Sequence, residues 1–289
     1  MTTVLALDIG GTKVAAGRVD RSGAILGRAV RPTPAGTDPE VVWAAVAEVL
    51  AEARGGDEVR CGVGCGGPMT SGGATVSPLN VGAWRGFPLR ARVEAFTGLA
   101  TAVDNDAKAL ALGEGWIGRA AGARDYLAMV VSTGVGGGIV LDGRLLDGRE
   151  GNAGHIGHVV VEPGGRRCGC GARGCLEAEA SGTAIAELTG APAAEAPEEV
   201  RVRAGRLVGR AVGSVANLLD LRLAVVAGSV ALGYGATFFE AARAELAETA
   251  CLDHSRGASI EPAGLGADGP LVGAAAVALR AMGVEGFPG

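Results

Sequence analysis

The sequence predicts a layered α/β fold with two lobes and a ligand cleft between them. The chain has 289 residues, of which 48% are hydrophobic, and this is more than one compact core usually needs. A glycine-rich turn that joins two expected strands occurs once in each half, at 8–13 and at 132–138. Strand and helix patterns also alternate along both halves. Together these observations favour two α/β lobes.

The N-terminal half has the predicted order β-β-β-α-β-α-β-α. One helix start is clear, because Asp38-Pro39-Glu40 offers an N-cap, a proline at the first helical position and an acid in the first turn. The residues that follow are apolar at helical spacing. We expect strands at 4–7, 14–19, 24–29, 59–63 and 100–103. We expect one helix from 38 to 54, a short helix that ends at about 96, and a third helix from 106 to about 116.

The C-terminal half repeats this pattern with different loops. Asp142-Gly143 is a favoured two-residue hairpin turn. We expect strands at 126–131, 138–141 and 223–227, and helices at about 176–188, 198–219, 234–247 and 273–282. The predicted domains are residues 1–106, joined by a C-terminal helix at about 270–289, and residues 107–269.

A cysteine-rich turn supplies a complete set of metal ligands. His158, Cys168, Cys170 and Cys175 lie within eighteen residues and form a Cys3His set of the kind that binds zinc. Because the protein supplies all four ligands, the zinc is predicted to be structural, with no open position for catalysis. Two alternatives remain: reduced cysteines without a metal, and a catalytic zinc whose fourth ligand is water.

The other three cysteines are Cys61, Cys65 and Cys251. Six cysteines in a chain of this length do not indicate a disulfide scaffold. We therefore expect these three to be small buried hydrophobic residues rather than reactive thiols.

The first glycine-rich turn is a candidate phosphate site. Its residues are Asp8, Gly10, Gly11, Thr12 and Lys13. The exposed N–H groups of such a turn can bind phosphate oxygens, while the lysine adds a positive charge and the threonine a hydroxyl. The aspartate can hold Mg²⁺ directly or through water. The alternative is a plain hairpin in which Asp8 caps its own turn.

The second glycine-rich turn makes the nucleotide interpretation stronger. Its residues lie at the matching place in the other half: Ser132, Thr133, Gly134, Gly136 and Gly137. Two such turns favour a site for nucleotide phosphates, although the chain has no Walker-type Gly-Lys-Ser/Thr. Gly228 and Ser229, at the end of a later strand, can pack under an adenosine or serve only the local packing.

Asp106 is the candidate catalytic base. It follows a predicted strand and begins a predicted helix, where its carboxylate can accept the proton of an alcohol that attacks a γ-phosphate. The neighbouring Asn105 can hold a hydroxyl. The alternative is that Asp104 or Asp106 only caps the helix.

Charge and hydropathy exclude several classes of protein. The net charge is −5 and there is no basic stripe, so we expect no nucleic-acid partner. No apolar run reaches the ~18 residues that a membrane span needs. The chain enters a strand pattern at once, with no signal peptide before it. We expect a cytoplasmic protein without a membrane partner.

With these motifs in place, the chain resembles the ROK (repressor, ORF, kinase) family of sugar kinases over essentially its full length. The resemblance rests on 8–13, 105–106, 132–138, 154–158 and the cysteine motif 168–177. It implies an actin-like (ribonuclease H-like) ATPase fold, usually dimeric, that binds ATP, Mg²⁺ and a sugar. The repressor branch carries an N-terminal helix-turn-helix, which is absent here, so the kinase branch is favoured.

The resemblance also implies the roles of individual residues. Asp106 would act as base towards the sugar 6-hydroxyl, and His158 would both bind zinc and contact the sugar. The implied sugar contacts are Asn80, Asn105, Asp106, His155, His158 and Glu177. A regulator that binds sugar without catalysis remains an alternative, as does polyphosphate in place of ATP.

One position departs from the usual family pattern. Family glucokinases usually have a glutamate where this chain has His155, and a neutral imidazole offers one donor and one acceptor instead of a carboxylate. The run 153–158 resembles bacterial N-acetylmannosamine kinases, as do 1–3 and 228–230. This resemblance implies N-acetylmannosamine as the first-choice substrate, with glucose as the alternative.

Overall fold

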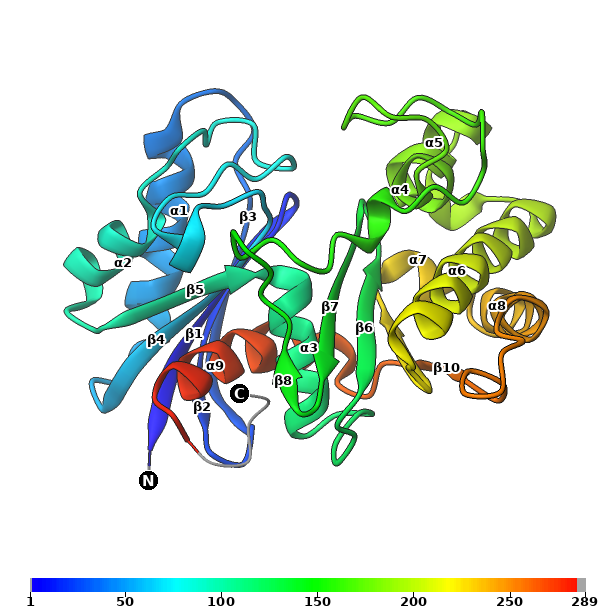
Figure 1. Ribbon diagram of the computed structural model, residues 1–289. Helices are drawn as coiled ribbons and strands as arrows, with labels where there is room; N and C mark the ends of the chain where they lie inside the picture. The colour runs from blue at the N-terminus through cyan, green and yellow to red at the C-terminus, as the bar shows by residue number, and fades with distance from the viewer. Residues whose placement is uncertain (1, 285–289) are drawn as a thin grey trace. The chain divides into compact units, whose positions relative to one another are not determined.

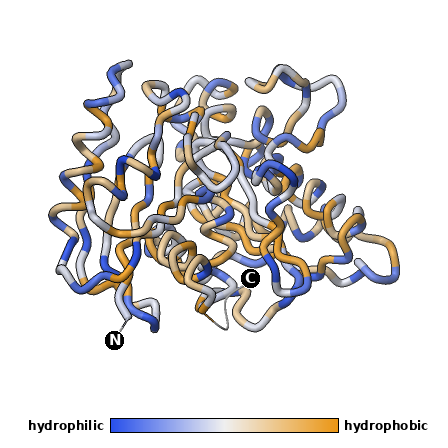
Figure 2. The backbone as a smooth tube through the Cα atoms, turned by 60° about the vertical axis from the view of Figure 1, so that its left-hand side comes forward, coloured by the Kyte–Doolittle hydropathy of each residue, from blue (hydrophilic) through white to orange (hydrophobic). Residues whose placement is uncertain are grey.

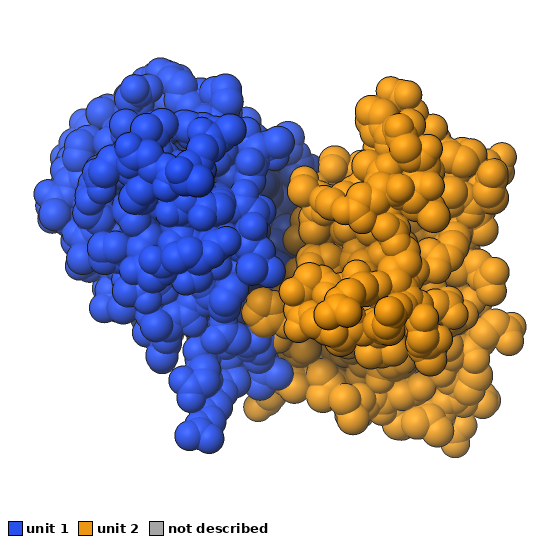
Figure 3. Space-filling view, turned by 90° about the horizontal axis from the view of Figure 1, so that it is seen from above, with its two compact units in different colours: residues 1–122, 143–153, 265–289 blue, residues 123–142, 154–264 orange. Residues whose placement is uncertain are grey.

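The computed structural model describes residues 2–284 and divides the chain into two compact units (Figure 3). Unit 1 comprises residues 1–122, 143–153 and 265–289, and unit 2 comprises residues 123–142 and 154–264. The chain therefore leaves unit 1 twice and returns to it for its C-terminal helix. Met1, and the part of the expected C-terminal helix at 285–289, lie outside the described residues.

Unit 1 contains a five-stranded sheet in the order β3-β2-β1-β4-β5. β1 is antiparallel to β2, as β2 is to β3, whereas β1, β4 and β5 run parallel. The register aligns the carboxyl ends of the three parallel strands, with Ile9, Cys65 and Asn105 side by side. The bounds are β1 Thr3–Ile9, β2 Lys13–Asp20, β3 Ile25–Pro32, β4 Glu58–Cys65 and β5 Thr101–Asn105.

Helices cover both faces of this sheet (Figure 1). Alternate residues of β1 point to opposite faces, so Leu5 and Leu7 pack into the core that includes α1, while Val4 and Ala6 pack with α9. Every residue of β1 is buried, and Figure 2 colours the hydrophobic segments of the chain orange. The bounds are α1 Pro39–Ala53, α2 Leu89–Thr97, α3 Asp106–Trp116 and α9 Gly269–Ala281, with a 3₁₀ turn η1 at Ser71–Gly73.

α9 approaches the sheet closely because β4 has a glycine beneath it. A Cβ atom on Gly62 would lie 2.0 Å from the carbonyl oxygen of Ala274 and 2.9 Å from the Cβ of Ala278. Only a residue without a side chain fits there, and this is how the last helix of the chain packs against the first sheet.

Unit 2 holds most of a second sheet, whose order is β10-β9-β6-β7-β8. β6, β9 and β10 are parallel, and β7 is antiparallel to β6. The two-residue β8 belongs to unit 1. The strand bounds are β6 Tyr126–Val131, β7 Val135–Leu141, β8 Arg144–Leu145, β9 Leu223–Ala227 and β10 Ser259–Pro262.

The helices of unit 2 complete its core. α6 and α8 pack so closely that a Cβ on Gly205 would lie 2.3 Å from the carbonyl oxygen of Phe238. The helix bounds are α4 Leu176–Ala180, α5 Gly182–Thr189, α6 Glu198–Leu219, α7 Ser229–Tyr234 and α8 Ala236–Thr249. The 3₁₀ turns are η2 Ile156–His158, η3 Ala193–Glu195 and, in unit 1, η4 Gly266–Asp268.

Most expected elements are present, and the predicted helix cap at Asp38 and the hairpin turn at Asp142-Gly143 are confirmed. Asp38 caps α1 by accepting a hydrogen bond from the Glu40 N–H at 2.9 Å. Asp142 and Gly143 both have positive φ, 52° and 73°, as a type I′ hairpin turn requires. No helix among residues 2–284 is long and apolar enough to cross a membrane.

Three predicted elements are wrong in detail. β7 begins at Val135 rather than 138. The single helix expected at 176–188 is two helices, because the Ser181 side chain accepts a hydrogen bond from Ala184 N–H and caps a new one. The helix expected from 234 is also divided: α7 ends at Tyr234, and Gly235 takes a positive φ of 57° before α8.

Candidate functional site

In unit 1, polar side chains gather where the parallel strands β1, β4 and β5 end. The register places Asp8, Gly64 and Asp104 side by side, and Asp106 begins α3 two residues further on. A Cβ atom on Gly64 would lie 3.8 Å from the Asp8 Oδ1 and 3.7 Å from the Asp106 Cα. The carboxyl ends of strands are where open α/β sheets bind ligands.

Burial makes the two carboxyl groups of this edge unusual. Burial, then the negative charge of Asp106, raises the pKa of Asp8 to about 7, although Lys13 acts in the opposite direction. Burial also raises the pKa of Asp106, and this outweighs the stabilising N–H of Ala107. Two desolvated carboxyls favour a bound cation or a proton, so the pair suits metal binding and proton transfer.

Asn105 is the N-cap of α3. Its Oδ1 accepts a hydrogen bond from the Ala107 N–H at 3.0 Å, and the Asp106 Oδ1 accepts from the same N–H at 2.9 Å. The Asp104 Oδ1 instead accepts the Asn105 N–H at 2.8 Å. Asp104 therefore does not cap α3, whereas the Asp106 carboxyl shares the Ala107 N–H with the N-cap residue Asn105.

The glycine turn between β1 and β2 packs against Asn80. A Cβ on Gly11 would lie 2.9 Å from the Asn80 Cβ, and a Cβ on Gly66 would lie 3.0 Å from its Oδ1. The turn closes through a hydrogen bond from Gly10 N–H to the Lys13 carbonyl at 3.0 Å. The side chains of Thr12 and Lys13 are exposed. The structure thus brings this turn, Asn80 and the two carboxyls to one edge of unit 1.

Two residues that sequence reasoning missed hold these loops in place. The Arg85 guanidinium donates to the carbonyls of Pro78, at 3.0 Å, and of Val81, at 3.3 Å, on both sides of Asn80. The Thr33 hydroxyl donates to the Gly10 carbonyl at 2.7 Å. Neither has a local sequence signal, because the partners depend on how the loops fold back.

In unit 2, the second glycine-rich turn is the hairpin between β6 and β7. Ser132 N–H donates to the Gly134 carbonyl at 2.9 Å, and the hydroxyls of Ser132 and Ser229 are 2.9 Å apart. Gly228 has a φ of 102°, and a Cβ there would lie 2.3 Å from the Val131 carbonyl oxygen. The expected residues at the ends of β6 and β9 therefore lie together.

Gly136 and Gly137 lie within β7, and not in the turn itself. A Cβ on Gly137 would lie 2.9 Å from the Ile156 Cγ2 and 3.1 Å from the Gly154 carbonyl oxygen. Close packing of the strand against the segment that carries His155 accounts for this glycine.

The four expected metal ligands come together in unit 2. The ligand atoms of His158, Cys168, Cys170 and Cys175 all lie within 4.8 Å of one another. The Cys170 and Cys175 sulfurs are 3.7 Å apart, and the Cys168 sulfur is 3.6 Å from the His158 Nδ1. A tetrahedral site with Zn–S bonds of about 2.3 Å has S–S edges of about 3.8 Å, so the set fits zinc.

The remaining expected sugar contacts, His155 and Glu177, lie next to the metal ligands in the sequence. The His155 and His158 rings are 5.9 Å apart with an angle of 26° between their planes. Cys175 is the N-cap of α4, so Glu177 follows a metal ligand by two residues. The Glu177 Oε2 accepts a hydrogen bond from the Val135 N–H at 2.9 Å, a contact that the sequence did not indicate.

The other cysteines differ in their surroundings. Cys61 and Cys65 are buried on β4 as expected, and burial raises the pKa of the Cys61 thiol to about 12. The expectation of a buried Cys251 is wrong, because that residue is exposed just beyond the end of α8. Its thiol lies against the carbonyls of Ala247 and Glu248.

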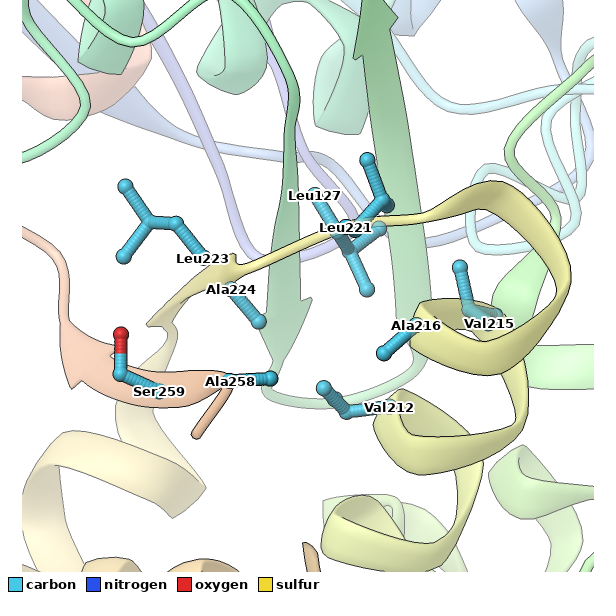
Figure 4. A pocket seen from close by; sticks show the side chains of 9 residues that line it. All are labelled: Leu127, Val212, Val215, Ala216, Leu221, Leu223, Ala224, Ala258 and Ser259. Atoms are coloured by element: carbon cyan, nitrogen blue, oxygen red, sulfur yellow. The ribbon is translucent and has the colours of Figure 1, made fainter. Parts of the chain in front are cut away.

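An apolar hollow of unit 2 contains none of the predicted site residues (Figure 4). It has no room for a water molecule, so it is a packing defect rather than a ligand site. Its lining residues are Leu127, Val212, Val215, Ala216, Leu221, Leu223, Ala224, Ala258 and Ser259.

Comparisons with known proteins find similarity along most of the chain. The model of the ROK family matches residues 4–281. An N-acetylmannosamine kinase of Citrobacter koseri is 41% identical over 249 residues, which cover 81% of this chain and 85% of that protein.

Two solved structures have the same fold along nearly their full length. The ROK family glucokinase from Streptomyces griseus, in complex with glucose and AMPPNP, is 32% identical with a TM-score of 0.85 and covers 96% of this chain and 99% of that one. The ROK hexokinase from Thermus thermophilus is 36% identical with a TM-score of 0.80 and covers 98% of this chain and 99% of that one.

Proposed function

Because this chain belongs to the ROK family, we propose that it transfers the γ-phosphate of ATP to the 6-hydroxyl of a sugar, with N-acetylmannosamine as its first-choice substrate. It is a sugar kinase with the actin-like ATPase fold of its relatives. The observation that carries the proposal is the pair of desolvated carboxyls, Asp8 and Asp106, at the carboxyl edge of β1, β4 and β5.

Asp106 is the proposed general base. As the sugar 6-oxygen attacks, its proton moves to the Asp106 carboxylate, the new O–P bond forms, and the bond from the γ-phosphorus to the leaving oxygen of ADP breaks. The raised pKa of Asp106 makes it a better proton acceptor than an ordinary aspartate. The amide of Asn105 has its Oδ1 committed to the α3 cap, so its NH₂ group is the part that we assign to a sugar hydroxyl.

The two glycine turns are the proposed phosphate sites. Thr12 and Lys13 are exposed on the first turn, and Ser132, Thr133 and Gly134 form the second. Asp8 is the residue that would hold Mg²⁺, since its carboxyl is buried beside a second carboxyl and the charge of Lys13 does not offset the effect of burial. Bound Mg²⁺ would neutralise charge that develops on the transferring phosphoryl group.

We propose that the metal turn, residues 158–175, holds the sugar-binding residues in place. His158, Cys168, Cys170 and Cys175 would hold zinc, which would fix the fold of the turn without taking part in the reaction. His155, the outer edge of the His158 ring and the Oε1 of Glu177 are the groups that we assign to sugar hydroxyls.

N-acetylmannosamine is favoured by likeness to the Citrobacter koseri kinase and by His155. A coupled assay of ADP release tests this choice with N-acetylmannosamine, glucose, mannose and N-acetylglucosamine. We expect the highest kcat/KM with N-acetylmannosamine. Glucose as the best substrate would favour the alternative, a glucokinase like that of Streptomyces griseus. No ADP release with any sugar would favour a non-catalytic regulator.

We further propose that the protein acts as a homodimer in the cytoplasm, where ATP is supplied. The family resemblance supports the dimer. Light scattering should give about twice the chain mass of 28.5 kDa, and a mass of one chain would contradict this.

A further inference from the structure

The hairpin between β6 and β7 is held by the segment that contains α4 and α5. Gly182 N–H donates to the Ser132 carbonyl at 2.7 Å, and the Thr183 hydroxyl donates to the Thr133 carbonyl at 3.0 Å. On the other side of the turn, Val135 N–H donates to the Glu177 Oε2 at 2.9 Å. The backbone of the candidate nucleotide turn is thus tied to side chains and backbone about fifty residues away.

The Glu177 contact differs from the others because its acceptor is a side-chain carboxyl group rather than a backbone carbonyl. A hydrogen bond to an ionised carboxylate is about twice as strong as one between neutral groups. The contact is also close, since a Cβ on Gly134 would lie 2.8 Å from the Glu177 Oε2. A side chain at Gly134 would therefore have to displace the Glu177 carboxyl group from its place beside the hairpin.

α4 is at the same time part of the metal turn. Its N-cap is the metal ligand Cys175, and its first N–H, from Leu176, donates to the Val159 carbonyl at 2.9 Å, one residue after His158. Glu179 is buried and accepts the Arg166 N–H at 2.6 Å, two residues before Cys168. One short helix therefore has one carboxylate on the hairpin and another on the cysteine loop.

We propose that Glu177 is a positioning residue through which the metal turn sets the affinity of the hairpin for nucleotide. This inference rests on the proposed function, in which the hairpin binds ATP phosphates. His158 and Cys175 would be fixed by bound zinc, Cys175 would fix the start of α4, and Glu177 would then hold the Val135 N–H, so that the turn at Ser132–Gly134 keeps one conformation. Metal loss is expected to weaken binding of nucleotide as well as of sugar.

Direct binding to the zinc-loaded full-length protein tests this without turnover. AMPPNP with Mg²⁺ is titrated by calorimetry in the absence of sugar, so that contacts between Glu177 and the sugar do not affect the measured affinity. We expect Glu177→Ala to weaken AMPPNP binding roughly tenfold, as loss of a charged hydrogen bond does. Glu177→Gln keeps an acceptor oxygen and should recover most of this affinity.

The matched control is Glu187→Gln. Glu187 lies on the neighbouring α5 and pairs with Arg166 at the surface. It should bind AMPPNP as the wild type does. Zinc content by metal analysis and the unfolding temperature identify variants that have lost the metal turn itself.

The decisive comparison combines the variant with metal removal. Chelation should weaken AMPPNP binding of the wild type roughly tenfold, but should add less than about twofold to Glu177→Ala, because the connection is already absent. An equal loss of AMPPNP affinity on chelation in the wild type and in Glu177→Ala would overturn the inference. So would wild-type affinity in a Glu177→Ala protein that keeps its zinc.

Amide hydrogen exchange separates this inference from the proposed function. If the wild type does not bind AMPPNP at all, the assignment of the hairpin to nucleotide is wrong. The positioning role is still read from the Val135 amide, which should exchange faster after chelation and in Glu177→Ala. An unchanged Val135 amide in both would overturn the positioning role.

Discussion

Burial, together with the negative charge of Asp106, raises the pKa of Asp8 to about 7. Asp8 lies on β1 and Asp106 begins α3, and a Cβ atom on Gly64 of β4 would lie within 4 Å of both residues. A protein gains nothing in stability from two such desolvated carboxyls, and the arrangement is typical of a site that binds a cation or moves a proton.

Asp8→Asn should therefore make the nucleotide-free protein more stable at pH 8. The folded pKa lies near 7 and the ordinary value is 3.8, so the folded state holds the proton more tightly. The folded state gains stability by holding this proton. That gain is fully present below the Asp8 pKa of the unfolded chain, 3.8, and is lost as the pH rises through the Asp8 pKa of the folded protein, about 7. We expect a gain of about 4 kcal/mol over wild type at pH 8 and little gain near pH 4.

Urea unfolding at the two pH values, without Mg²⁺, measures this difference. The same variant should bind Mg²⁺ and ATP more weakly. An equal stability difference at both pH values would show that Asp8 is ionised normally.

Lys108 should be essential to the stability of unit 1. Its side chain is buried, and its Nζ lies 3.0 Å from an Asp104 oxygen, 2.7 Å from an Asp147 oxygen and 3.2 Å from the Gly151 carbonyl. Lys108→Met leaves two carboxylates without this cation and should cost about 3 kcal/mol in the free energy of unfolding.

Arg280 still pairs with both carboxylates, so a double variant tests whether the cost comes from the negative charge that Lys108 no longer offsets. Lys108→Met with Asp104→Asn should recover part of the loss, since one of the carboxylates is then neutral. Arg124→Met is the control, because Arg124 pairs with Asp142 in an exposed position and should change the free energy of unfolding by less than about 0.5 kcal/mol. A similar loss in both single variants would contradict the role of Lys108.

Two glycines of the metal turn should respond differently to the same change. Gly174 has a φ of 72°, and a Cβ there would lie 1.7 Å from the Glu162 carbonyl oxygen, whereas a Cβ on Gly169 meets no atom within 4 Å. Gly174→Ala should lose zinc and lower the unfolding temperature, and Gly169→Ala should do neither. Metal analysis of the two purified variants checks this, and full zinc content in Gly174→Ala would refute the geometry of the turn.

His155 should influence which sugar is preferred. A glutamate at this exposed position would offer acceptors only, in place of the donor and acceptor of a neutral imidazole. We expect His155→Glu to raise the ratio of kcat/KM for glucose to kcat/KM for N-acetylmannosamine by roughly tenfold. An unchanged ratio, with both sugars still phosphorylated, would remove His155 from the sugar contacts.

The parts of the fold and site that the sequence predicted are those with local signals. Asp38-Pro39 marked the start of α1, Asp142-Gly143 marked a hairpin, and the cysteine spacing marked the metal set. Each of these depends on residues that are close in sequence, or on ligands whose chemistry is specific.

The parts that were missed depend on contacts between distant residues. Asp147 lies 39 residues from Lys108, and Val135 lies 42 residues from Glu177, so no spacing rule connects them. The division of the helix at Ser181 did have a local signal, since serine is a favoured N-cap, but the apolar pattern around it hid the break.

The most direct test of the proposed kinase is the turnover of Asp106→Asn. Asn105 still caps α3 in this variant, so the fold should persist, and calorimetry should show wild-type binding of AMPPNP. Loss of the base should lower sugar-dependent ADP release by roughly 100-fold or more. ADP release near the wild-type rate would contradict the assignment of Asp106 and the mechanism built on it.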